Sequence, residues 1–313
     1  MADRELDCVI IGGGPAGMTA ALYLARFRRR FRLLDAGHPR AAWIPESHNI
    51  PFFAEGMPGP EMLDTLRGHL ARYGVEPERA TVSAIQREEN RFVAVAETPE
   101  GEARQIRARR VLLATGAVDI EPDLPGLPDA IRRGLVRYCP ICDGFEARGR
   151  DIAVLGPGDR GLGEAIFIAR TYSHRVTLLT LGRKLELDPK RRAEAEGHGV
   201  RIVEDPVESL EMEGDRIAAL RAGGEHRFEI LYSALGLRWR SDLALALGAE
   251  HDQEGALLVD EHNQTTVPGL YAAGSIVRGL DQIVVGMGHA AIAATHIHNR
   301  CELPTEDEPK GEV

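Results

Sequence analysis

Two glycine-rich turns constrain the fold of this chain more than any other feature of its sequence. Each has glycine at its first, third and sixth places, and the turns begin at Gly12 and at Gly156. Each follows a short apolar run and opens a helix-like segment, which leads to another apolar run. This strand–turn–helix–strand order is typical of a nucleotide-binding unit built on a parallel sheet. Two copies therefore predict two such units.

The glycines of both turns have a steric reason. Backbone N–H groups at a helix N-terminus bind a diphosphate, and side chains at the turn would block its approach. The alternative for each copy is a tight turn that holds no ligand. The residues that this argument assigns to nucleotide binding are Gly12, Gly14 and Gly17 in the first turn, and Gly156, Gly158 and Gly161 in the second.

The ends of the strands that follow these helices differ between the two copies. Asp35 ends the strand of the first copy, where a carboxylate accepts hydrogen bonds from the ribose of FAD or NAD. The matching place in the second copy has Thr180, followed closely by Arg183 and Lys184. These two cations lie where they could contact a 2′-phosphate, or they are surface residues; Asp35 could likewise be a solvated turn residue.

Composition limits the classes of function. The chain has 313 residues, which favours two domains, and 43% of them are hydrophobic, so it can bury cores. Its 48 acidic and 38 basic residues give a formal net charge of −10, which argues against a nucleic-acid surface. No apolar run reaches the roughly 18 residues of a membrane helix, and the first strand begins near Asp7, which leaves no room for a signal peptide. We therefore expect a cytoplasmic protein with no membrane or nucleic-acid partner.

A Cys-x-x-Cys pair lies just before the second copy. Cys139 and Cys142 have the spacing of thiols that cycle between a dithiol and a disulfide. If Pro140 opens a helix, Cys139 lies at its cap, where the helix dipole lowers a thiol pKa. Asp143 follows the second thiol and could protonate a departing thiolate if burial raised its pKa. The alternative for Asp143 is an acid at a helix start.

The rival interpretation of the cysteine pair is half of a zinc site. Zinc would need two more soft ligands nearby. Cys8 lies inside the first strand and Cys301 near the C-terminus, and they form no second pair. We therefore expect no metal, and we interpret Cys8 as a buried small residue and Cys301 as an incidental thiol.

The order of these parts is recognisable. A glycine turn, the strand end Ala114-Thr115-Gly116, the pair with Asp143, a second glycine turn and an Ala-Ala-Gly strand end at Gly274 follow one another. This order resembles the small, bacterial-type thioredoxin reductases, which are FAD- and NAD(P)-dependent pyridine nucleotide-disulfide oxidoreductases. The resemblance covers nearly all of residues 5 to 303, and the position of the cysteine pair just before the second unit is its specific part.

The resemblance implies an architecture. The expected fold class is α/β, with two Rossmann-like, doubly wound nucleotide-binding domains, the second inserted in the first. Residues 1–117 and 241–313 would form the FAD-binding domain, and residues 118–240 the NAD(P)-binding-like domain with the cysteine pair. The family also implies a homodimer and a rotation of the cysteine-bearing domain between flavin-facing and substrate-facing positions.

The resemblance also assigns the FAD contacts and the roles of the thiols. Cys142 would face the flavin and Cys139 would attack an external disulfide, carried by a thioredoxin-like protein or by a small molecule. Electrons would come from NADPH or NADH. The residues that would contact FAD are Gly12, Gly14, Pro15, Ala16, Gly17, Asp35, Arg40, Asn49, Val82, Ala114, Thr115, Gly116, Gly274, Ser275, Gln282 and Ile283.

The chain departs from the family at several positions. The family's His-Arg-Arg, which grips the 2′-phosphate, is replaced at residues 180–182, and losing both arginines would weaken NADPH binding by roughly two to four decades. The family's Gly-Asp near the FAD ribityl is Gly274-Ser275 here, and an arginine beside Gln282 is lost.

These departures keep other functions open. The donor could be ferredoxin or a second flavin, the enzyme could be a dithiol oxidase that uses oxygen, or the chain could be a flavin-bearing redox sensor. Five arginines between Arg26 and Arg32 suit the C-terminus of the first helix. They could instead bind an acidic electron carrier.

Overall fold

The structure is a computed structural model that describes residues 6–220 and 224–301. The chain folds into two compact units. The first unit comprises Met1–Ala42, Gly59–Val118 and Arg238–Val313, and the second comprises Trp43–Pro58 and Asp119–Leu237. Residues 43–58 therefore group with the second unit, although the family resemblance implies that they belong to the first.

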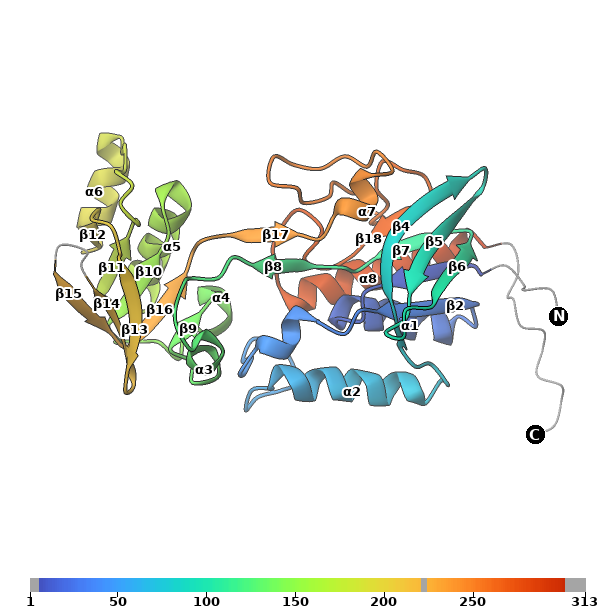
Figure 1. Cartoon of the computed structure of the whole chain (residues 1–313), viewed down its shortest axis with the longest axis horizontal. Coiled ribbons are helices and arrows are strands. Elements are labelled where there is room, and N and C mark those ends of the chain that lie inside the picture. The colour runs from blue at the N-terminus through green and yellow to red at the C-terminus, as the bar shows by residue number, and fades with distance from the viewer. Residues whose placement is uncertain (1–5, 221–223, 302–313) are drawn as a thin grey trace. The chain divides into compact units, whose positions relative to one another are not determined.

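The first unit is built on a parallel sheet of five strands in the order β18-β7-β1-β2-β3. Helices α1 and α8 pack against each other beside this sheet (Figure 1). A separate antiparallel sheet of three strands and a short helix, α7, complete the unit. The bounds are β1 (Cys8–Ile11), α1 (Pro15–Arg26), β2 (Phe31–Asp35), η1 (Arg40–Trp43), α2 (Gly59–Ala71), β3 (Glu78–Arg79), β4 (Thr81–Glu88), β5 (Arg91–Glu97), β6 (Ala103–Ala108), β7 (Val111–Leu113), α7 (Asp242–Leu245), β18 (Leu270–Ala272) and α8 (Ile283–Asn299).

The second unit repeats this plan. Its five-stranded parallel sheet has the order β12-β11-β10-β16-β9, and an antiparallel sheet of three strands accompanies it. The two chain segments that join the units pair as strands β8 (Ala117–Asp119) and β17 (Leu237–Trp239). The bounds within the unit are α3 (Leu127–Arg132), β9 (Val136–Arg137), α4 (Pro140–Asp143), β10 (Ile152–Leu155), α5 (Gly158–Thr171), β11 (Val176–Leu179), α6 (Pro189–Gly197), β12 (Arg201–Val203), β13 (Ser209–Glu213), β14 (Arg216–Leu220), β15 (Glu225–Phe228) and β16 (Ile230–Ser233).

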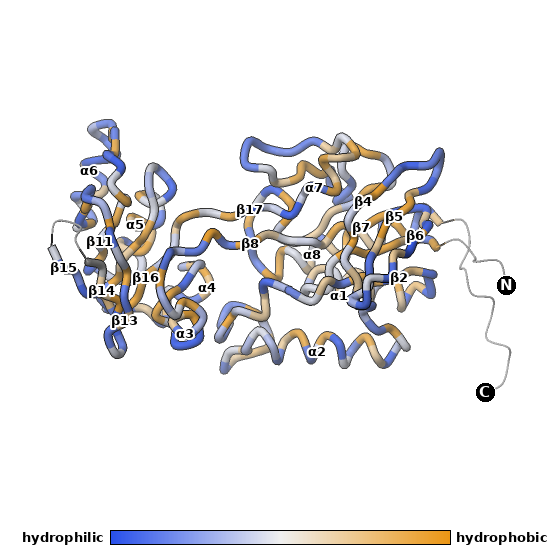
Figure 2. Tube along the Cα trace, in the orientation of Figure 1, coloured by the Kyte–Doolittle hydropathy of each residue, from blue (hydrophilic) through white to orange (hydrophobic). Residues whose placement is uncertain are grey.

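The central strands are apolar because both faces of a parallel sheet are covered. All four residues of β1 and of β10 are buried. Figure 2 shows hydrophobic residues along the strands of both parallel sheets and hydrophilic ones around α6. The predicted α/β fold with two Rossmann-type units, the second inserted in the first, is confirmed.

The segment that leads into the last helix contains one short strand. Residues 265–275 have apolar residues that suggest a strand, but only β18, three residues long, forms there. Helix α8 begins at Ile283, and a Cβ at Gly286 would lie 3.0 Å from the Cα of Gly274, so the helix packs closely at this point. The polar tail after Leu303, which the sequence predicts to be loose, lies outside the described residues.

Candidate active site

Cys139 and Cys142 form a disulfide at the start of α4. Pro140 occupies the first helical position, which needs no N–H donor, and Cys139 is the N-cap, as the sequence analysis expected. The N–H of Cys142 donates to the carbonyl oxygen of Cys139 at 2.9 Å. Both cysteines are partly exposed, so an external thiol can reach them. Across residues 6–220 and 224–301 no group of three or more side chains could hold a metal ion.

Asp143 directly follows Cys142 in α4, and its side chain is partly buried. The Tyr232 hydroxyl donates to its Oδ1 at 2.7 Å, and a guanidinium nitrogen of Arg137 lies 3.7 Å from the same oxygen. Burial raises the pKa of Asp143, and the charge of Arg137 only partly opposes this effect. A carboxyl group that keeps its proton at higher pH is suited to protonate a departing thiolate. The burial on which the proposed acid role depends is therefore present.

Glu164 is a further acid, which lies outside the sequence motifs described above. It lies on α5, and burial raises its pKa to about 7, with Asp143 raising it further and Arg160 opposing. Its Oε1 is buried and has no hydrogen-bond partner among the described residues. An acid within the apolar run of a predicted helix was the sequence signal that could have found it.

The first glycine turn is tightly packed on one side and open on the other. Gly12 has a φ of +112°, and a Cβ there would lie 2.3 Å from the carbonyl oxygen of Ala114. A Cβ at Gly17 would lie 1.8 Å from the oxygen of Gly12, whereas one at Gly14 would meet nothing within 4 Å. Gly14 is the N-cap of α1 and provides no side-chain cap. The first turn of α1 can therefore offer its N–H groups to a diphosphate.

Asp35 lies beside this turn. Its Oδ1 accepts a hydrogen bond from the N–H of Gly13 at 3.1 Å, and a Cβ at Gly13 would lie 2.6 Å from its Cγ. The carboxylate thus sits at the carboxyl end of β2, next to the helix N-terminus, where an adenosine ribose is bound in this kind of fold. The residues present fit FAD at this turn.

A second carboxylate, which the sequence analysis did not assign, lies near Gly274. The Ser275 hydroxyl donates to one oxygen of Asp281, and the Arg40 guanidinium donates to the other. Gly274 has a φ of +83°, and a Cβ there would lie 3.0 Å from that of Ala16, so this network lies close to the start of α1. The family's acid is absent at position 275, but the fold brings an acid to that serine from residue 281.

The other predicted FAD contacts lie where the chain leaves the first unit and at the starts of α1 and α8. The Thr115 hydroxyl donates to the carbonyl oxygen of Arg240 at 2.7 Å, and Gly116 accepts from the N–H of Arg240 at 3.0 Å. These bonds join the two segments where the chain leaves and re-enters the first unit. Gln282 and Ile283 are the N-cap and first residue of α8, and Pro15 is the first residue of α1.

The last two predicted contacts, Val82 and Asn49, belong to other segments of the chain. Val82 lies on β4 and packs against the core of the first unit. Asn49 belongs to the second unit, where its amide donates to the carbonyl oxygen of Ile141 at 3.5 Å, inside the Cys-x-x-Cys segment. Their contacts with FAD stay predictions.

The second glycine turn has the same packing as the first. A Cβ at Gly161 would lie 2.2 Å from the oxygen of Gly156, and one at Gly156 would lie 2.8 Å from the oxygen of Ala234. Gly158 is open, with a φ of +68°, and the N-cap Pro157 provides no side-chain hydrogen bond. The backbone therefore fits a second diphosphate.

The residues that follow β11 in the second unit differ from Asp35 at the end of β2 in the first. Thr180 is fully buried, and its hydroxyl donates to the carbonyl oxygen of Arg183 at 2.6 Å. The side chains of Arg183 and Lys184 are exposed. These cations are the groups of this loop that a nucleotide phosphate could contact.

The arginine run after α1 is largely engaged within its own unit. Arg26 donates to the Tyr73 hydroxyl at 2.6 Å, and the Nε of Arg29 donates to the Nδ1 of His298 at 2.9 Å. Arg32 pairs with Glu78. These contacts hold α1 and β2 to neighbouring elements and favour the structural interpretation of the run.

Comparison with known proteins gives the family. Residues 6–295 match the family model described as pyridine nucleotide-disulphide oxidoreductase. The chain belongs to this family. A thioredoxin reductase of Listeria innocua serovar 6a is 28% identical over 317 residues, which cover 96% of each protein. One of Mycolicibacterium smegmatis is 31% identical over 283 residues, covering 87% of this chain and 88% of that protein.

Solved structures agree with these relatives. Thioredoxin reductase from Streptococcus pyogenes MGAS5005 has a TM-score of 0.86 and 26% identity, covering 95% of this chain and 98% of that one. The chain is thus a thioredoxin reductase-like flavin disulfide oxidoreductase, as the resemblance implied, and its family uses FAD and NAD(P)H. The relatives do not favour a non-pyridine donor, a dithiol oxidase or a redox sensor.

Proposed function

We propose that this pyridine nucleotide-disulphide oxidoreductase passes electrons from NADPH or NADH, through FAD, to the Cys139–Cys142 disulfide. The reduced pair then reduces a thioredoxin-like protein or a small disulfide. The observation that carries this proposal is the partly exposed disulfide, followed in the chain by Asp143, whose partly buried carboxyl group has a raised pKa. The thioredoxin reductases among the relatives support the choice of partner.

The two turns would hold the two nucleotides. FAD at the first turn would supply a two-electron carrier between a nicotinamide and a disulfide. The N–H groups of the first turn of α1 bind its diphosphate and Asp35 accepts from its ribose, while Asp281 orients Ser275 and Arg40. The second turn binds the diphosphate of the nicotinamide nucleotide through the start of α5.

The thiol steps follow from disulfide exchange. Two electrons and two protons convert the Cys139–Cys142 disulfide into a dithiol. The Cys139 thiolate attacks one sulfur of the external disulfide, and the other sulfur leaves as a thiolate, which takes its proton from Asp143. The Cys142 thiolate then attacks the Sγ of Cys139, so the internal disulfide reforms and the second substrate thiolate leaves.

Anaerobic mixing tests the donor and the disulfide together. We expect NADPH or NADH to bleach the flavin absorbance of the oxidised protein and reduced ferredoxin to leave it unchanged. Thioredoxin or a small disulfide should then be reduced in steady state. Cys139→Ser and Cys142→Ser should each abolish this second step, whereas Cys301→Ser, which removes a thiol outside the pair, should not. Full turnover by Cys139→Ser would contradict the proposal.

We also propose a homodimer in the cytoplasm. An exchangeable disulfide that must be re-reduced fits a reducing compartment, and dimerisation rests on the family resemblance. Light scattering during size-exclusion chromatography measures the mass directly, and a value near the 34.2 kDa of one chain would contradict the dimer. No helix within residues 6–220 and 224–301 is long and apolar enough to cross a membrane.

A further inference from the structure

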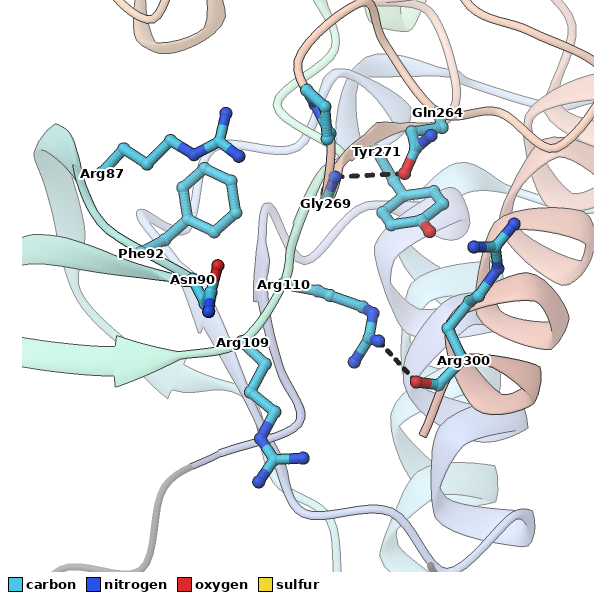
Figure 3. A pocket seen from close by; sticks show the side chains of 10 residues that line it. Arg87, Asn90, Phe92, Arg109, Arg110, Gln264, Gly269, Tyr271 and Arg300 are labelled. Atoms are coloured by element: carbon cyan, nitrogen blue, oxygen red, sulfur yellow. Dashed lines mark hydrogen bonds between the residues drawn. The ribbon is translucent and has the colours of Figure 1, made fainter. Parts of the chain in front are cut away.

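A cavity of about 290 Å³ lies in the first unit, at the edge of the parallel sheet opposite the glycine turn. Arg110 directly precedes β7, Gly269 directly precedes β18 and Arg300 directly follows α8, and all three line the cavity. The glycine turn follows the carboxyl end of β1, which runs parallel to β7, so the turn and the cavity lie at opposite ends of these strands. The cavity, whose lining is drawn in Figure 3, is therefore separate from the nucleotide site.

The lining of this cavity is strongly basic. Four of its ten described lining residues are arginines, Arg87, Arg109, Arg110 and Arg300, and none of the ten is acidic. The whole chain carries a net charge of −10, so this concentration of positive charge runs against its average. Like charges around one cavity repel each other, and an anion between them relieves that repulsion.

Some donors are held in place. An Nη of Arg110 donates to the carbonyl oxygen of Arg300 at 2.6 Å, which fixes the guanidinium at the cavity wall (Figure 3). The Gln264 Oε1 accepts from the N–H of Gly269 at 3.1 Å, so the amide NH₂ is the end that remains to contact a ligand. Fixed donors lose less side-chain entropy on binding than mobile ones.

The cations converge on the wall formed by Tyr271. Burial raises the pKa of Tyr271, while Arg110 and Arg300 both lower it, so both charges act at this hydroxyl. Asp260 and Cys8 act in the opposite sense. The hydroxyl also lies 3.0 Å from the Nδ1 of His296. Across the cavity, the Arg87 guanidinium lies 6.0 Å from the centre of the Phe92 ring.

We propose that this cavity binds a small ligand through a phosphate group. The guanidinium fork matches the oxygens of a phosphate, and several forks around one space suit a multiply charged oxyanion. A volume of about 290 Å³ lies at the lower end of the range for ligand pockets, which favours inorganic phosphate, pyrophosphate or the terminal phosphates of a nucleotide. This site is independent of the redox function proposed above.

Calorimetric titration of the FAD-loaded protein tests the proposal. Pyrophosphate should bind, and inorganic phosphate should bind more weakly because it carries fewer charges. ADP binding as tightly as pyrophosphate would identify a nucleotide as the source of the phosphate, and weaker binding would identify the free anion. Arg87→Gln with Arg300→Gln, which changes only exposed side chains, should raise the Kd for pyrophosphate by up to about tenfold, because exposed charges are screened.

Controls separate this cavity from other anion sites. Arg132→Gln removes the same charge from the exposed surface of the second unit and should leave the Kd unchanged. Disulfide reductase activity should be equal in all variants, since none of these residues belongs to the redox site. No pyrophosphate binding, or a Kd that the double substitution leaves unchanged, would overturn the proposal.

Discussion

In the first unit Asp35 lies against its glycine turn, whereas in the second unit Thr180 turns its hydroxyl into its own loop. The backbones of the two turns are otherwise alike: in each, the sixth residue packs onto the carbonyl oxygen of the first. We infer that the glycines shape a binding site for a diphosphate, while the side chains at the strand ends select the nucleotide. Four predictions test the two turns and the residues around them.

The largest effect should come from adding a side chain inside the first glycine turn. A Cβ from Gly17→Ala would lie 1.8 Å from the oxygen of Gly12, so the turn must move away from its diphosphate-binding geometry. We expect FAD affinity to fall by more than about a hundredfold, measured by flavin retention and fluorescence titration.

The matched change in the second unit is Gly161→Ala. This variant should stay yellow and lose reduction by NAD(P)H. Gly68→Ala on α2, where a Cβ would meet nothing within 4 Å, is the neutral control. Loss of flavin from Gly161→Ala would contradict the assignment of the two turns.

A difference between α1 and α5, the helices that follow the two turns, should make the stability of the protein depend on pH. Ala20 of α1 and Glu164 of α5 occupy equivalent positions, three residues after Gly17 and Gly161 respectively. Ala20 is buried, and so is the carboxyl group of Glu164. Because burial raises the pKa of Glu164 from 4.5 to about 7, the folded protein holds this proton more tightly than the unfolded chain. Stability is therefore lost as pH rises from about 4.5 through 7.

Glu164→Gln should remove this loss. We expect a gain of up to about 3 kcal/mol above pH 7 and almost none near pH 4.5, measured as the difference in thermal midpoint from the parent. Exposed Glu196 on α6, changed to Gln, is the control and should change little at either pH. An equal gain from Glu164→Gln at both pH values would show that ionisation is not the cause.

A smaller effect should come from the carboxylate near Gly274. Asp281→Asn breaks the ion pair with Arg40 and weakens the bond from Ser275. We expect FAD to bind about tenfold more weakly, since one charge-assisted interaction is lost, in a titration of the apoprotein. Ser275→Ala should weaken FAD binding less than Asp281→Asn does. The reverse order would mean that Asp281 does not position this network.

The smallest effect should come from the exposed loop of the second unit. Arg183→Gln with Lys184→Gln should lower kcat/KM for NADPH by up to about tenfold, because exposed charges are screened, and leave that for NADH unchanged. Lys190→Gln on α6 is the charge-matched control. If the variant and the parent have the same kcat/KM for NADPH, and likewise for NADH, the two cations are surface residues with no role in coenzyme binding.

Much of the site was predictable from local sequence. The glycine turns, Asp35 and the Cys139–Cys142 pair stand in short motifs whose spacing alone specifies the geometry. Helix α4 was equally local, since Pro140 specifies its first residue. Glu164 and Asp281 were missed because their significance lies in burial and in contacts with residues far away in the chain.

By itself, the sequence determined the class of fold and the order of the nucleotide and redox motifs, because these follow from periodicity and local turn chemistry. Only the tertiary structure decided that Asp281 meets Ser275 and Arg40, that the carboxyl group of Glu164 is buried, and that four arginines from three segments surround one cavity. Such contacts join residues separated by up to hundreds of positions, and the distance between them depends on how sheets and helices pack rather than on any local pattern.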